Sequence, residues 1–129
     1  MMRAASWRFF ERSDFSAMVS SSAWWESRIF AASADEDLRE LLDRLIDRAY
    51  HEAPAAKYYH QAYRHGLLEH CLSVAQAVSA ISATFPGIDR DVAVTGALLH
   101  DIGKLEAYAA DASDLTDAGR LQGEIALGY

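Results

Sequence analysis

The stretch GALLHDIGKLEAY, residues 96–108, decides how this sequence is interpreted. Small and apolar residues lead directly into His100 and Asp101. An imidazole and a carboxylate are costly to bury unless they find partners. Their position at the end of an apolar helical run therefore indicates a site. A second apolar run upstream, GLLEHCLSVAQAV at residues 66–78, carries His70.

Apolar residues recur at helical spacing along three segments, residues 35–50, 67–84 and 90–101, and we expect each to be a helix. Ser33 and Glu36 have the spacing of a capping box at the start of the first segment. No segment alternates with the period of two that a strand requires. The sequence therefore predicts an all-α domain.

The second and third expected helices each carry one inward histidine. His70 follows Leu67 by three residues and precedes Val74 by four, which places it on the packed side of its helix. The third helix has Asp89 as its expected N-cap and Gly103 as its expected C-terminal stop. Its predicted stripe consists of Val92, Ala93, Gly96, Ala97 and His100. The small residues of that stripe would let another helix approach closely.

Two inward imidazoles from adjacent helices, with Asp101 beside one of them, form a set of two nitrogens and one oxygen. Imidazole suits the borderline divalent metals, and carboxylate suits Mn or Mg. Neighbouring side chains diverge by about 100° within a helix, so His100 and Asp101 can face one ion only where the last turn unwinds. The structural alternative is a pair of core histidines with satisfied hydrogen bonds, with Asp101 capping a turn.

The composition limits the class of protein. The chain has 129 residues, which suits one domain, and a single cysteine, which excludes a disulfide framework and a cysteine-rich zinc site. A net charge of −7 argues against a broad nucleic-acid footprint. No apolar run approaches the roughly 20 residues of a membrane span, and the N-terminus lacks the apolar stretch of a signal peptide. We therefore expect a cytoplasmic protein without a membrane partner.

Two parts of the chain differ in their pattern. Residues 1–32 are rich in aromatic residues but show no clean periodicity, and we expect an irregular or helical lead-in there. Residues 33–129 show the helical patterns described above, and we expect them to form one domain.

The motifs carry a resemblance to a known family. LLEHCLSVA and LLHDIGK resemble the His motif and the His-Asp motif of the HD-domain superfamily of metal-dependent phosphohydrolases. The three segments PAAKYYHQAYRHGLLEHCLSVA, DRDVAVTGALLHDIGKLEAY and LTDAGRLQGEI look like the HD domain of the 3′-to-5′ exoribonuclease family. They extend from Pro54 to Ile125, slightly more than half the chain.

The sequence also departs from that family. Gln61 stands where a second consecutive His is usual, His65 replaces a Gly, and Glu124 takes the position of a His. The sequence ends at Tyr129, before the later helices that supply further histidines and a closing Asp in the superfamily. The oligonucleotide-binding β-barrel that usually precedes the domain is not found in it. We expect an HD-domain-like helical bundle truncated at its C-terminus, whose exposed apolar edge favours a homo-oligomer.

The resemblance implies a set of site residues. His70, His100 and Asp101 would be the metal ligands, Asp101 would also orient the attacking water, and Lys104 would lie near the substrate phosphate. Glu124 would be either a replacement ligand or a solvated charge on a helix.

Two further residues are additional candidates. The resemblance places His60 and Lys57 close to the site. The alternative is that both are loop residues on a solvated turn.

The resemblance also implies a reaction, the metal-dependent hydrolysis of a phosphoester. The substrate would be a nucleotide or the 3′ end of a short RNA, and the cofactor a divalent ion (Mn, Mg, Ni, Co, Fe or Zn). The alternative is a degenerate HD domain that binds a ligand or supports an assembly without catalysis. Glu124 and the missing closing Asp favour that alternative, whereas the intact residues His70, His100, Asp101 and Lys104 favour an enzyme.

Overall fold

The computed structural model describes residues 33–58, 60–109 and 114–129. In chain order its helices are α3 (Glu36–Leu45), α4 (Arg48–Glu52), α5 (Gly66–Ser82), α6 (Arg90–Leu99), α7 (Lys104–Ala107) and α8 (Asp117–Leu127). The described residues contain no strand, which confirms the predicted all-α fold. None of these helices is long and apolar enough to cross a membrane. The lead-in predicted for residues 1–32 lies outside the described residues.

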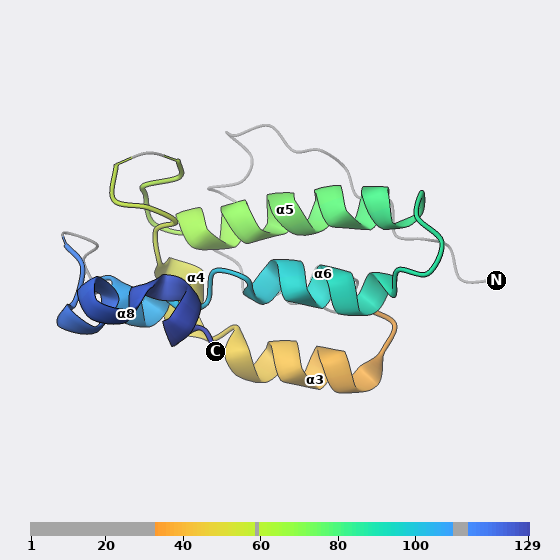
Figure 1. Ribbon diagram of the computed structural model, residues 1–129, viewed down its shortest axis with the longest axis horizontal. Helices are drawn as coiled ribbons and strands as arrows, with labels where there is room; N and C mark the ends of the chain where they lie inside the picture. Colours follow the sequence, from red (N-terminus) through yellow and green to blue (C-terminus); the bar gives the residue numbers. More distant parts are fainter. Residues whose placement is uncertain (1–32, 59, 110–113) are drawn as a thin grey trace.

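Helices α5 and α6 form the centre of the bundle. They lie side by side as an antiparallel pair, and α3 lies along the other side of α6 (Figure 1). The two short helices α4 and α7 and helix α8 gather at the end where α5 begins and α6 stops (Figure 1). The core consists of Leu42, Ile46, Tyr50, Leu67, Leu68, Cys71, Leu72, Ala75, Val94, Ala97 and Leu98.

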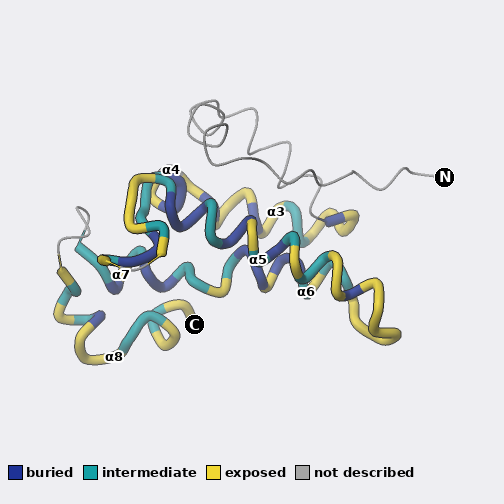
Figure 2. The backbone as a smooth tube through the Cα atoms, turned by 90° about the horizontal axis from the view of Figure 1, so that it is seen from above, coloured by how far each residue is buried: buried dark blue, intermediate teal, exposed yellow. Residues whose placement is uncertain are grey.

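The two ends of the α5–α6 pair differ in burial. The far end exposes four large apolar side chains: Ile81, Phe85, Ile88 and Val92. Figure 2 shows the loop between α5 and α6, residues 83–89, coloured as exposed. At the other end, Leu67, Cys71 and Leu98 are fully buried. The packed end of the pair is therefore the end that carries His70 and His100.

The prediction of a single helix over residues 35–50 is wrong, because the structure divides this segment between two helices, α3 and α4. Helix α3 ends at Leu45, and Asp47 begins α4 by accepting a hydrogen bond from the backbone N–H of Tyr50 at 3.0 Å. The expected capping box at Ser33 and Glu36 is also wrong. Asp35 is the N-cap, and its side chain accepts from the backbone N–H groups two and three residues later.

The predicted stripe on the third helix needs correction. Asp89 caps α6 as expected, but Val92 and Gly96 are exposed, and the buried face is formed by Val94, Thr95, Ala97 and Leu98. Because a Cβ at Gly96 would meet no atom within 4 Å, that glycine serves no close helix contact. The helix ends at Leu99, two residues earlier than predicted.

Gly103 has a role other than the expected helix stop. Its φ of −62° is right-handed, so no special backbone conformation requires glycine. A Cβ there would lie 1.9 Å from the carbonyl oxygen of Glu124 and 2.6 Å from the backbone nitrogen of Gly128. The missing side chain therefore lets the end of α8 pack directly against the turn that follows Asp101.

Helix α8 presents apolar side chains to solvent. Leu121 is 85% exposed and Ile125 is 76% exposed. The structure thus contains the exposed apolar edge that the sequence predicted, and the homo-oligomer expected from it stays a prediction.

Candidate metal centre

The end of α6 unwinds where the His-Asp pair begins. His100 is the C-cap of the helix, and residues 101–103 form a turn that leads into α7. His100 Nδ1 lies 2.7 Å from the carbonyl oxygen of Ala97. A carbonyl can only accept a hydrogen bond, so Nδ1 carries a proton, and in the neutral form of the ring Nε2 is the nitrogen with the free lone pair. The unwound turn and this bond together allow His100 and Asp101 to face the same side.

The two imidazoles converge on one carboxylate oxygen. His70, on the second turn of α5, and His100 have ring centroids 5.3 Å apart, which confirms the predicted convergence. The Nε2 atoms of both rings lie 3.4 Å from Asp101 Oδ2. Within the described residues, these three are the only group of His, Cys, Asp or Glu whose ligand atoms all lie within 4.8 Å of one another.

This spacing fits a divalent metal ion. Two ligand atoms that each lie about 2.1 Å from an ion, at a tetrahedral angle, are about 3.4 Å from each other. Both nitrogen–oxygen distances have that value. Two imidazole nitrogens and one carboxylate oxygen are also ligands that Zn, Fe, Co, Ni and Mn accept. The residues present therefore fit the group that the sequence implies.

The protonation state of His70 supports the same arrangement. Burial lowers the pKa of His70 below its usual value, and the nearby imidazoles of His100 and His60 lower it further, although the charge of Asp101 opposes the shift. A neutral imidazole has the free lone pair that metal coordination requires.

Lys104 belongs to the same cluster. Its side chain is only 7% exposed, and its Nζ lies 2.7 Å from Asp101 Oδ2, the oxygen that faces both histidines. A buried ammonium needs a charged partner, and Asp101 is that partner. The site therefore holds one cation of its own beside the carboxylate.

Two buried polar groups that the sequence did not mark lie behind the His-Asp pair. Cys71 Sγ is 4.0 Å from His100 Nδ1. Burial raises the pKa of the Cys71 thiol to about 11, so this residue is a neutral neighbour and not a thiolate ligand. The hydroxyl of Tyr50, on α4, donates a hydrogen bond to the carbonyl oxygen of Leu98. The sequence pattern showed Cys71 only as one member of an apolar seam and gave no signal for Tyr50.

The three additional candidates occupy different positions. The His60 ring stacks at a tilt against His70, with centroids 4.9 Å apart. Lys57 pairs with a carboxylate outside the cluster, since its Nζ is 3.4 Å from Asp114 Oδ1. Glu124 is half-buried on α8, and its side-chain oxygens do not belong to the group of converging ligand atoms.

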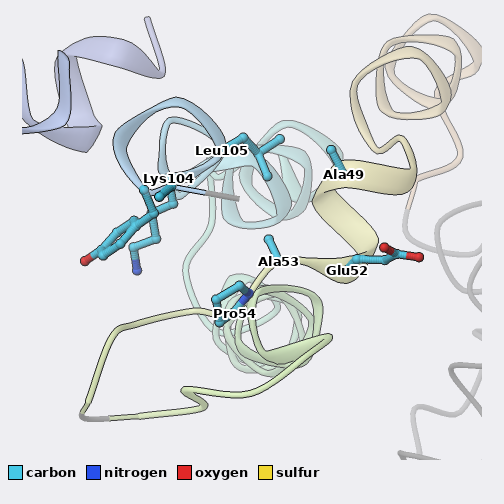
Figure 3. Close-up of a pocket in the computed structure, with 8 residues that line it drawn as sticks. Ala49, Glu52, Ala53, Pro54, Lys104 and Leu105 are labelled. Atoms are coloured by element: carbon cyan, nitrogen blue, oxygen red, sulfur yellow. The ribbon is translucent and has the colours of Figure 1, made fainter. Parts of the chain in front are cut away.

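Lys104 also lines a hollow of about 300 Å³ between α4 and the α7 segment (Figure 3). The other walls are mostly apolar and are formed by Ala49, Glu52, Ala53, Pro54, Leu105, Tyr108 and Ala109. This hollow offers contact surface beside the cluster, whereas the metal-binding atoms lie at His70, His100 and Asp101.

The helical fold and the cluster of His70, His100 and Asp101 can be compared with the arrangement that the HD-domain resemblance implied. An all-helical domain that brings a His from one helix against a His-Asp pair at the end of the next is what the HD-domain resemblance implied. Residues 67–126 match the HD domain family, which bears out the resemblance that the motifs indicated.

Curated relatives point in the same direction. The chain is 33% identical over 90 residues to a Listeria welshimeri protein named 3′-5′ exoribonuclease YhaM, an alignment that covers 69% of this chain and 28% of the relative. It is 35% identical over 75 residues to the Bacillus subtilis protein of the same name, covering 57% of this chain and 24% of that protein. The chain thus spans about a quarter of the length of these relatives. No solved structure matches it.

Proposed function

We propose that this domain hydrolyses a phosphoester bond in a nucleotide or at the 3′ end of a short RNA, with a divalent metal ion held by His70, His100 and Asp101. The observation that carries the proposal is the convergence of both Nε2 atoms on Asp101 Oδ2 at 3.4 Å. The match of residues 67–126 to the HD domain family and the names of the relatives support the reaction class.

Each residue has a separate part in this reaction. When bound, a divalent ion supplies positive charge that polarises a phosphate oxygen and lowers the pKa of a water molecule. Asp101 would orient that water through the carboxylate that faces both imidazoles. Lys104 would hold this carboxylate in place and offset the negative charge that develops on the phosphate. The bond from His100 Nδ1 to the Ala97 carbonyl would keep the His100 ring turned toward His70.

Three residues extend the proposal. His60, stacked on His70, would contact the substrate beside the ion. Lys57 would attract the phosphate backbone of a longer substrate. Glu124 would supply a further carboxylate ligand after a rearrangement of the end of α8.

The test measures hydrolysis of nucleotides and of an end-labelled short RNA, with Mn²⁺, Mg²⁺, Ni²⁺ or Co²⁺ added to the dialysed protein. Asp101→Ala should lose activity by about 10³-fold or more, because metal catalysis contributes several kcal/mol to the barrier. Asp43→Ala is the matched control, since Asp43 is an exposed carboxylate on α3. Equal activities in Asp101→Ala and the control would contradict the proposal.

A second function is favoured by one observation. Lys104 Nζ lies closer to Asp101 Oδ2, at 2.7 Å, than either imidazole does. The cluster would then be an ion-pair network in a domain that binds a ligand or supports an assembly without catalysis. Wild-type protein that binds no divalent ion and hydrolyses none of these substrates would favour this second function.

A further inference from the structure

The carbonyl groups at the end of α6 have partners from three sources. The last carbonyls of a helix lack partners within the helix and must find them elsewhere. The carbonyl of Ala97 accepts from the side chain of His100, and that of Leu99 accepts from the backbone N–H of Ile102 at 3.0 Å. The carbonyl of Leu98 accepts from the hydroxyl of Tyr50. Of these three bonds, the last one ties the end of α6 to another helix.

Tyr50 is well placed for that purpose. It is fully buried, and its ring belongs to the hydrophobic core. The break between α3 and α4 determines its position, because Asp47 starts α4 by accepting from the backbone N–H of Tyr50. The division of the expected single helix therefore directs this hydroxyl toward the end of α6.

Cys71 completes the contact from α5. Its sulfur lies 4.0 Å from His100 Nδ1. Against the larger effect of burial, the Tyr50 hydroxyl and the backbone N–H of Asp101 are close enough to the thiol to lower its pKa. Cys71 therefore lies against His100, and Tyr50 binds the carbonyl of Leu98, two residues before His100. Neither one contributes a ligand atom to the converging group.

We propose that Tyr50 is a positioning residue for the candidate metal centre, which fixes the end of α6 through the Leu98 carbonyl so that His100 and Asp101 face His70. The inference rests on the proposed function, since it presumes that these three residues hold an ion. Loss of the hydroxyl would leave the Leu98 carbonyl buried without its partner and would loosen the turn that presents the ligands. Outer groups that orient metal ligands typically change metal affinity by about 10- to 100-fold.

The experiment compares Tyr50→Phe with Thr95→Val in the full chain. Thr95 lies on α6 and is also buried, but its hydroxyl has no hydrogen-bond partner within the described residues. The control thus removes a buried hydroxyl from α6, the helix whose end Tyr50 binds, without removing a hydrogen bond. Calorimetric titration with Mn²⁺ gives the affinity, the visible spectrum of bound Co²⁺ reports ligand geometry, and circular dichroism checks folding.

We expect Tyr50→Phe to bind Mn²⁺ about 10- to 100-fold more weakly than wild type and to change the Co²⁺ spectrum, while Thr95→Val keeps both. An affinity equal to that of the control, even with lowered thermal stability, would show that Tyr50 only supports the core and would overturn the inference. Wild-type protein that binds neither ion would overturn the proposed function and this inference together.

A second variant applies if Tyr50→Phe does not fold. Asp47→Ala removes the cap that fixes the start of α4 and leaves Tyr50 itself intact. Such a cap is worth about 1 kcal/mol, so the affinity for Mn²⁺ should fall by about 5-fold. An unchanged affinity in this folded variant would overturn the inference.

Discussion

Two pairs of histidines in this domain look alike but differ in what they can bind. The rings of His70 and His100 lie 5.3 Å apart, and those of His51 and His65 lie 6.0 Å apart. Burial lowers the pKa of His70 and of His51. In the first pair, one carboxylate oxygen, Asp101 Oδ2, faces both rings, and within the described residues these three form the only such group of ligand atoms. In the second pair, His65 Nδ1 is directed at the backbone carbonyl of His51 at 2.6 Å.

Two features, the closeness of two imidazoles and a histidine with a lowered pKa, are therefore shared by a pair that has the ligand geometry for a metal ion and by a pair that lacks it. A site also needs ring nitrogens that point at one position and an oxygen ligand at that position. The turn after α6 provides both for the first pair.

The largest expected effect distinguishes the two pairs by metal affinity. His100→Ala removes a proposed ligand and should weaken Mn²⁺ binding by about 100-fold or more, beyond the range seen for outer groups. His65→Ala, its matched control, should leave the affinity unchanged. Calorimetric titration of both variants measures this. If the two substitutions had equal effects, the distinction between the pairs would be lost.

The next effect concerns the turn that presents the first pair. Gly103→Ala introduces a Cβ 1.9 Å from the Glu124 carbonyl oxygen and should destabilise the fold by about 1–3 kcal/mol, as overpacking does. Gly96→Ala is the control, because a Cβ there meets nothing. It should stabilise α6 by up to about 1 kcal/mol. Urea unfolding of both variants gives the two values, and a stable Gly103→Ala protein would show that α8 does not pack on this turn.

A substitution at His65, in the pair His51 and His65, should change the free energy of unfolding by a smaller amount. His65 has a left-handed φ of 70°, which costs a non-glycine residue about 1–2 kcal/mol. His65→Gly relieves this strain, but it loses the side-chain bond to the His51 carbonyl, worth about 1 kcal/mol. The unfolding free energy should therefore change by less than about 1 kcal/mol. A large loss would mean that this pair is a structural centre of the domain.

The smallest effect is a pH dependence from the second pair. Burial and the nearby His65 hold the pKa of His51 below its usual value, despite the charge of Glu52. Because the pKa of His51 is lower in the folded state, the neutral His51 ring contributes fully to the free energy of unfolding above pH 6.5, about the ordinary pKa of histidine. This contribution is lost as the pH falls through the lowered pKa. His51→Gln should lack that part of the pH dependence when unfolding is followed from pH 7 to pH 5, and an identical slope in both proteins would contradict the assignment.

Much of this domain follows from the sequence. The apolar spacing around His70 and the small and apolar run before His100 predicted two helices and the convergence of their imidazoles. These patterns are local, and helical periodicity reports them directly. The match of residues 67–126 to the HD domain family confirms the superfamily that the motifs indicated.

The remaining features depend on contacts between distant segments. The break before α4 arises from Asp47, which caps α4 by accepting from the backbone N–H of Tyr50. The apolar pattern continues through Ile46 and Ala49 and gave no sign of this break. Tyr50 reaches Leu98, 48 residues away in the sequence, and no periodicity within one helix encodes such a partner. The exposed Gly96 shows the same limit, because small residues on a helix do not reveal whether another helix lies against them.

The central claim is that His70, His100 and Asp101 hold one divalent ion, and a crystal structure of the protein soaked with Mn²⁺ tests it most directly. Anomalous difference density would locate the ion without reference to activity. We expect a peak about 2.0–2.3 Å from His70 Nε2, His100 Nε2 and an oxygen of Asp101. A peak beside His51 and His65, or an absence of density among the three residues at saturating Mn²⁺, would contradict it.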